Sequence, residues 1–375
     1  MLRGFLEKSG IVQKDFFIIF ILSLNALVGH YMILIIMGNV VSGLNVTYTE
    51  SLIIWTVYYI TLIGSGIAGS ILSKKIGRLN FLYLWMVFGV ISSLLLILLN
   101  NFTVSYVLTI GVLLGISAGL GIPSCLAYFA DFTFFENRGR VSGTILLFTN
   151  LSAPLFAISF RAVNLIVNLI IFAIWRGSGL IIFFLKPEEK TASEIKRKEK
   201  GTSILHNKPF VLFFTAWFMF LFIDRFEAPI LRNFLGDFYS FMLIVNPIVG
   251  GLSAFVAGLL SDWIGRKRVV LYGFITYGIA YAVIGIAPAS LFSWYFFVVM
   301  VSISIGILWV AFVFILWGDL SQPSTSEKYY VIGLIPFFLT SIIQQFSTQY
   351  VMMIPEISSF SLASFFLFLA VLPLL

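Results

Sequence analysis

Charge is scarce in this sequence: only 10% of its 375 residues are charged, whereas 60% are hydrophobic. In a soluble globular chain about a quarter of the residues are charged, so this chain lacks the polar surface that a water-soluble fold needs. Cys125 is the single cysteine, which excludes an intrachain disulfide and a cysteine-rich metal site. The net charge of +7 is interpreted as a signal of membrane topology rather than of nucleic-acid binding. We therefore expect a lipid bilayer as a partner, and no nucleic acid, metal or cofactor.

The sequence also lacks the groups that a membrane-embedded enzyme needs at one membrane face. It has two histidines, His30 and His206, and we find no metal-binding or acid–base cluster in its outer loops. It contains no Gly-x-x-x-x-Gly-Lys-Ser/Thr loop, so direct use of ATP is not expected. The sequence therefore predicts a protein that is not an enzyme.

What the sequence has in abundance is long apolar runs, and a membrane-spanning helix needs about 20 such residues. Twelve runs are long enough, and we predict an all-α polytopic membrane protein. The predicted spans are 16–38, 51–72, 81–99, 104–133, 141–161, 164–185, 209–230, 238–260, 269–287, 291–318, 329–352 and 357–375.

A single charged stretch divides these spans into two sets of six. Residues 186–208 carry seven Lys or Arg and four Glu, too many to enter a bilayer. We therefore predict an N-terminal bundle at 1–185, a cytoplasmic linker at 186–208 and a C-terminal bundle at 209–375. Most of the 23 Lys and Arg residues fall in loops on the linker's side, so both termini are predicted to be cytoplasmic, in the cell membrane.

The two predicted bundles share a sequence pattern at a constant spacing. Ser73, Ile76, Gly77 and Arg78 align with Ser261, Ile264, Gly265 and Arg266, and Asp131 aligns with Asp319 at the same spacing. Because the copies follow corresponding spans, they predict two parallel six-helix repeats.

These motifs carry a resemblance to a known family. The second copy reads Gly258-Leu-Leu-Ser-Asp262-Trp-Ile-Gly265-Arg266-Lys267-Arg268. It resembles the signature loop of the major facilitator superfamily, and the glycines near Pro123 resemble the fourth helix of its sugar and organic-acid carriers. Lys74 stands where the family usually has Asp, and the family's fourth-helix arginine is missing, so roles tied to that arginine are not carried over. The resemblance implies two six-helix bundles that rock about one central solute site.

We predict that the charged loops form a cytoplasmic gate. Asp262 is expected to pair with Arg138 or Arg140 at the start of the fifth span, and Lys74 with Glu327 at the start of the eleventh. Within each repeat, Asp131 is expected to pair with Arg78, and Asp319 with Arg266. The gate set is Gly69, Lys74, Gly77, Arg78, Asp131, Arg138, Arg140, Gly258, Asp262, Gly265, Arg266, Asp319 and Glu327.

Polar residues inside the spans are candidates for binding the solute or a coupling ion, because they are costly in lipid. His30 is the leading candidate for proton coupling or solute contact, with a hydrogen-bonded, neutral imidazole as the alternative. The neutral polar candidates, each of which could instead join helices, are Asn25, Asn150, Asn246, Trp309, Gln344 and Gln345. Asp224, Arg225 and Glu227 are expected either to line an outer vestibule or to form a solvated helix end. Arg176 is expected to extend toward the cytoplasm.

These features together predict a monomeric secondary transporter for a small polar solute, such as a sugar or organic acid, coupled to protons. Two alternatives remain. The first is a uniporter or exchanger with the same fold. The second is a transport-inactive sensor or scaffold, which the Lys74 departure keeps open.

Overall fold

The computed structural model describes residues 11–44, 46–97, 103–188, 204–322 and 325–375. The first ten residues and positions 189–203 of the predicted linker lie outside this part of the chain. Twelve helices in the described residues are long and apolar enough to cross a membrane, and no strand occurs among them. The predicted all-α architecture with twelve spans is confirmed.

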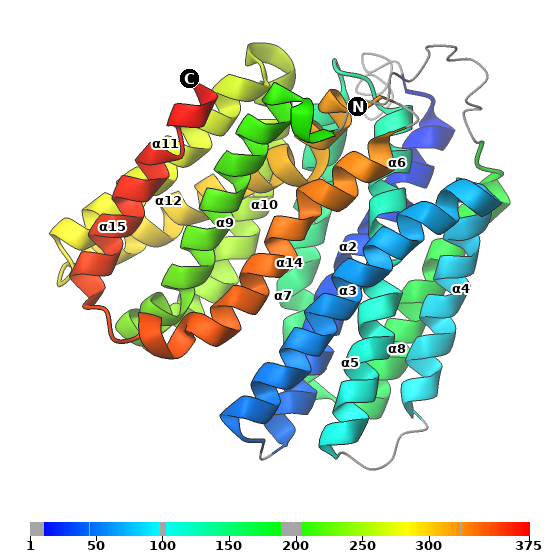
Figure 1. The fold of residues 1–375 in the computed structure, drawn as a ribbon, viewed down its shortest axis with the longest axis horizontal. Coiled ribbons are helices and arrows are strands. Elements are labelled where there is room, and N and C mark those ends of the chain that lie inside the picture. Colours follow the sequence, from blue (N-terminus) through cyan, green and yellow to red (C-terminus); the bar gives the residue numbers. More distant parts are fainter. Residues whose placement is uncertain (1–10, 45, 98–102, 189–203, 323–324) are drawn as a thin grey trace. The chain divides into compact units, whose positions relative to one another are not determined.

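The helices follow the predicted spans closely (Figure 1). The first six spans are α2 (Gln13–Gly43), α3 (Tyr48–Ile76), α4 (Arg78–Ile97), α5 with α6 (Val104–Gly119 and Ile122–Phe132), α7 (Arg138–Ala162) and α8 with a 3-10 turn (Leu165–Ser178 and Gly179–Leu185). The last six are α9 (Lys208–Leu235), α10 (Phe238–Ile264), α11 (Arg266–Ile286), α12 with a π-helical segment and α13 (Leu291–Trp309, Val310–Ile315 and Leu316–Leu320), α14 (Ser326–Val351) and α15 with a 3-10 turn (Glu356–Leu369 and Leu372–Leu374).

The chain forms two compact units, and each takes a short segment from the opposite half of the sequence. Unit 1 comprises Met1–Phe134, Ser152–Lys196 and Gln322–Ile332. Unit 2 comprises Phe135–Leu151, Arg197–Ser321 and Gly333–Leu375. The start of α14 therefore belongs to unit 1, and the start of α7 belongs to unit 2.

The internal packing of one unit repeats in the other. In unit 1, α3 packs on α5, α4 on α8, and α2 on α8. In unit 2 the corresponding spans pack in the same way: α10 on α12, α11 on α15, and α9 on α15. The sequence repeat therefore corresponds to a structural repeat.

Gly69 and Gly258 allow close approaches between helices. A Cβ on Gly69 would collide with the backbone of Leu120, between α5 and α6. A Cβ on Gly258 would collide with the backbone of Gly139 on α7. Side chains larger than hydrogen would push these helices apart.

Candidate functional site

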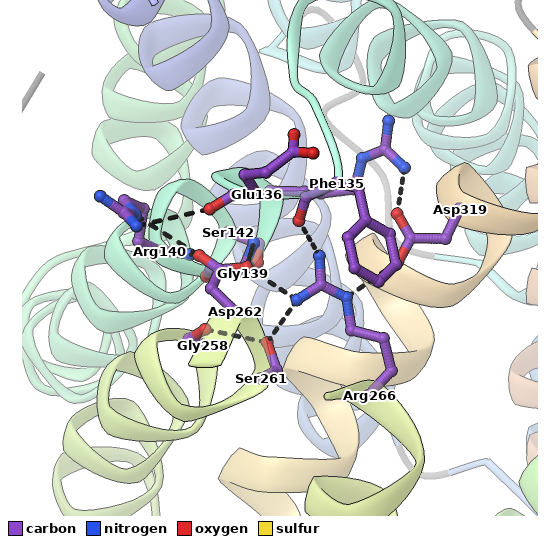
Figure 2. Close-up of polar contacts among 11 residues, drawn as sticks. Phe135, Glu136, Gly139, Arg140, Ser142, Gly258, Ser261, Asp262, Arg266 and Asp319 are labelled. Carbon is purple, nitrogen blue, oxygen red and sulfur yellow. Dashed lines mark hydrogen bonds and ion pairs between the residues drawn. The ribbon is translucent and has the colours of Figure 1, made fainter. Parts of the chain in front are cut away.

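A buried carboxylate in unit 2 caps the start of α7 (Figure 2). The Asp262 carboxylate accepts hydrogen bonds from the backbone nitrogens of Gly139 and Arg140, each at 2.9 Å, and lies 3.4 Å from the Arg140 guanidinium. The first backbone N–H groups of a helix have no partner within the helix, and they carry partial positive charge. One carboxylate at the end of α10 therefore binds the N-terminus of α7 and its arginine together.

Arg266 connects this carboxylate to a second one. Its guanidinium lies 2.7 Å from Asp262 and 2.8 Å from Asp319, and it also donates to the carbonyl oxygen of Phe135. The Phe135 ring lies under the same guanidinium, 4.3 Å from its central carbon. Arg138 completes the cluster by pairing with Asp319. We call this set the unit 2 cluster.

The matching positions of unit 1 form a second cluster around Arg78. Arg78 pairs with Asp131 and, at 2.9 Å, with Glu327 at the start of α14. The Ser73 hydroxyl donates to Glu327 at 2.7 Å, and the Ser326 hydroxyl donates to Asp131 at 3.2 Å. We call this set the unit 1 cluster, and within it the Glu327 side chain is 1% exposed and therefore shielded from water.

Most of the predicted pairs are present. Arg78–Asp131, Arg266–Asp319 and Arg140–Asp262 are ion pairs in the structure. Arg138, for which Asp262 was the expected partner, instead binds Asp319.

The largest departure from expectation concerns Glu327. Lys74 is its predicted partner, but Lys74 is exposed, and the Glu327 carboxylate binds Ser73 and Arg78. Ser73 was therefore missed as a functional residue. Its alignment with Ser261, whose hydroxyl lies 3.3 Å from Arg266, was the available signal.

The loop glycines of the two clusters match in conformation. Gly77 ends α3 with φ 84°, and Gly265 ends α10 with φ 95°. Residues that carry a side chain rarely adopt positive φ, so glycine is favoured at both positions. These turns direct Arg78 and Arg266 back toward the clusters.

Arg176 does not extend toward solvent as expected. It is 2% exposed, its central carbon lies 4.1 Å from the Trp85 ring centre, and its Nη1 donates to the Asn25 side chain at 3.3 Å. Gly89 leaves the space for its guanidinium. The amide of Asn25 also donates to the Trp175 carbonyl oxygen, so this candidate solute residue joins α2 to α8.

His30 lies against Tyr58 of α3, with 3.3 Å between its Nδ1 and the tyrosine hydroxyl. This contact gives one ring nitrogen a partner, and both alternatives for His30, proton coupling and a hydrogen-bonded neutral imidazole, stay predictions.

The three charged residues Asp224, Arg225 and Glu227 of α9 contact different neighbours. Asp224 accepts a hydrogen bond from Tyr277 at 2.9 Å, and Glu227, 5% exposed, accepts one from Ser359 at 2.6 Å. Glu227 is therefore not at a solvated helix end. The Arg225 guanidinium lies instead over the ring of Phe337, 5.0 Å from its centre.

The remaining neutral candidates stay predictions. Trp309 packs edge-on against Phe337 at 5.2 Å. Asn150 donates to its own helix at Leu146 and lies against Gly251 of α10. Asn246, Gln344 and Gln345 are half-buried.

Comparisons with known proteins agree with this architecture. A family model described as the Major Facilitator Superfamily matches residues 16–335. The human organic anion transporter MFSD10 (TETRAN) is similar with a TM-score of 0.73 and 15% identity, over 97% of this chain and 99% of that chain. The proton:xylose symporter XylE, bound to 6-bromo-6-deoxy-D-glucose, is similar with a TM-score of 0.69 and 16% identity, over 95% and 94%. No curated protein matches the sequence.

Proposed function

Because the chain belongs to the major facilitator superfamily, we propose that it is a secondary active transporter for a small polar solute. The solute is a sugar, an organic acid or a similar metabolite, and its transport is coupled to protons. The two structural neighbours are, by their descriptions, an organic anion transporter and a proton:xylose symporter. Both solute classes fit the half-buried amides and aromatic side chains of this chain.

Transport proceeds by alternating access, with the unit 1 and unit 2 clusters as the gate on the predicted cytoplasmic side. The observation that carries this proposal is that each cluster joins residues from both halves of the sequence. Glu327 binds Arg78 in one cluster, and Asp262 binds the start of α7 in the other. An opening on this side would separate these groups.

The strength of the contacts suits a gate that opens repeatedly. A hydrogen bond to a charged group contributes about 1.5–3 kcal/mol. Two conformations of a transporter differ by a few kcal/mol, so losing one such bond shifts their populations. Within each repeat, Arg78–Asp131 and Arg266–Asp319 keep the arginines paired, and they reduce the cost of breaking the cross-half contacts.

His30 is our candidate for the proton-coupling group. It is an imidazole on a predicted span, paired with a tyrosine hydroxyl that could exchange a proton with it.

The gate is tested by replacing Glu327 with Gln. This variant keeps the shape of the side chain and leaves Arg78 paired with Asp131. Ser70, which is 8% exposed and lies one turn before Ser73, is changed to Cys in a Cys125→Ser background as a reporter of opening. The expected result is roughly 10- to 100-fold faster labelling by a water-soluble maleimide in membranes.

Lys328→Gln is the matched control, because Lys328 is adjacent to Glu327 but exposed. It removes a charge without touching the cluster, and its labelling rate should equal that of the parent protein. Equal labelling in Glu327→Gln and Lys328→Gln would show that the cluster does not hold a gate.

The alternatives differ in what they move. A uniporter or exchanger would carry solute with no proton movement and would be insensitive to His30→Gln. A transport-inactive sensor would bind solute without flux, and the exposed Lys74 is the feature that favours it.

A further inference from the structure

Helix geometry places Arg225 on a different face of α9 from its acidic neighbours. Successive residues of an α-helix are rotated by about 100°, so Asp224 and Glu227 lie about 60° apart, and Arg225 lies about 160° from Glu227. The two acids face α11 and α15, where Tyr277 and Ser359 bind them. Arg225 therefore points away from Ser359, the residue that binds Glu227.

Arg225 also lies deep in its span. It precedes the end of α9 at Leu235 by ten residues, about 15 Å of helix. The predicted span ends earlier, at residue 230, which placed this arginine at the membrane edge. A cation inside a helix that is apolar enough to span a membrane is costly in lipid, and such residues mark solute or ion pathways.

Within the described residues, the Arg225 guanidinium forms no ion pair, and its buried Nε has no hydrogen-bond partner. Arg266 differs in both respects, because two carboxylates bind it. Arg176 also has no partner for its Nε and Nη2, but it is 2% exposed and donates to Asn25, whereas Arg225 is half-buried. Arg225 therefore retains donors for a group that the chain itself does not provide.

One aromatic ring contacts this cation, and a second ring packs against the first. Phe337 lies under the guanidinium at 5.0 Å, and Trp309 packs edge-on against Phe337, with 5.2 Å between ring centres and 82° between planes. Gln344 is seven residues after Phe337 on α14, so it lies on nearly the same face, about 10 Å further along. All four side chains are half-buried.

We propose that Arg225, Phe337 and Trp309 form the binding site for an organic anion that carries an aromatic or similarly flat apolar body. Arg225 binds the carboxylate of the solute, because a guanidinium presents paired N–H donors that match a carboxylate. Phe337 and Trp309 pack against the ring, and the Gln344 amide binds a polar substituent. This inference rests on the proposed transport function and narrows its solute class.

The packing of Phe337 also sets how the anion approaches. Because this ring covers one face of the guanidinium, the carboxylate is bound at the edge, where the N–H groups point. The face contact leaves the Arg225 charge available to the solute. A neutral analogue would gain the aromatic contacts and lose the charged one, so the site discriminates by charge.

The test uses the full-length protein, both in detergent and in proteoliposomes, with benzoate as the probe. Benzamide is its neutral analogue and acetate its counterpart without a ring. Benzoate binding is measured by quenching of tryptophan fluorescence, and uptake by radiolabel. We expect benzoate to bind more tightly than either analogue, and Arg225→Gln to weaken benzoate binding roughly 10- to 100-fold while leaving benzamide unchanged.

Three further variants make the result specific. Arg225→Lys should restore part of the benzoate affinity, because it returns the charge without the paired donors. Phe337→Leu should reduce the preference for benzoate over acetate. Arg232→Gln removes an exposed arginine from the same helix and should change nothing.

The outcomes separate this inference from the transport proposal. Benzoate binding that depends on Arg225 without any uptake would support the site and refute transport. Uptake of a neutral solute, with benzoate neither binding nor competing, would refute the site and support transport. Equal loss of benzoate and benzamide binding in Arg225→Gln would also refute the site, because it would indicate a packing role.

Discussion

Gly258→Ala tests the packing of the unit 2 cluster, because the three atoms nearest to the added methyl group all belong to backbone. Its Cβ would lie 3.0 Å from the carbonyl carbon of Gly139 and 3.1 Å from the Cα of Gly143, and it would collide with the Gly139 carbonyl oxygen. Carbon atoms pack at about 3.5–4.0 Å. Because the opposing atoms are backbone, α10 and α7 must separate by roughly 0.5–1 Å to accept the methyl group.

That separation acts on the unit 2 cluster. The hydrogen bonds from Gly139 and Arg140 to Asp262 are 2.9 Å long, so an added 0.5–1 Å, roughly, would take them past normal length. Overpacking of this kind costs about 1–3 kcal/mol. If the cost falls only on the closed gate, the open form gains roughly 5- to 150-fold in relative population.

The assay is maleimide labelling of Ser70→Cys in the Cys125→Ser background, with thermal unfolding in detergent measured in parallel. Labelling should accelerate in Gly258→Ala. Gly38→Ala is the control, because a Cβ on Gly38 has no atom within 4 Å, and it should match the parent. If Gly258→Ala labels and unfolds like Gly38→Ala, close approach of α10 to α7 does not hold the gate, and the reasoning fails.

Two further predictions concern stability. Gly89→Ala should destabilise the protein by about 1–3 kcal/mol, because its Cβ would lie 2.6 Å from Nη2 of Arg176. The effect should shrink in an Arg176→Met background, where a flexible apolar side chain replaces the buried cation. Equal losses of stability in both backgrounds, measured by thermal unfolding, would contradict this account. Gly77→Ala and Gly265→Ala should each lower the free energy of unfolding by about 1–2 kcal/mol, since alanine is strained at the positive φ of both residues. Unfolding temperatures that match that of Gly38→Ala would show that these turns accept alanine without strain.

The sequence predicted the features that depend on local pattern. Long apolar runs fixed the twelve spans, because lipid leaves few other solutions for a backbone. The constant spacing between Asp131 and Asp319 also predicted their pairs with Arg78 and Arg266. The repeat predicted that the two pairs would be equivalent, since each joins residues 53 positions apart in its own half.

Contacts between distant elements were not predictable in the same way. Arg176 is buried because Trp85 and Gly89, on another helix, form its pocket, and their sequence positions give no sign of it. The position of Arg225 within α9 was missed because the helix continues to Leu235, five residues past the predicted end of the span at residue 230. Both errors concern arginines whose environment is made by other helices.

Solute uptake into proteoliposomes that hold the purified protein tests the central claim most directly. The screen covers sugars, organic acids, amino acids and phosphate, with internal and external pH recorded and His30→Gln measured alongside. The account predicts uptake of one solute class with alkalinisation outside, and loss of the proton movement in His30→Gln. No uptake of any solute by protein that unfolds cooperatively would contradict it.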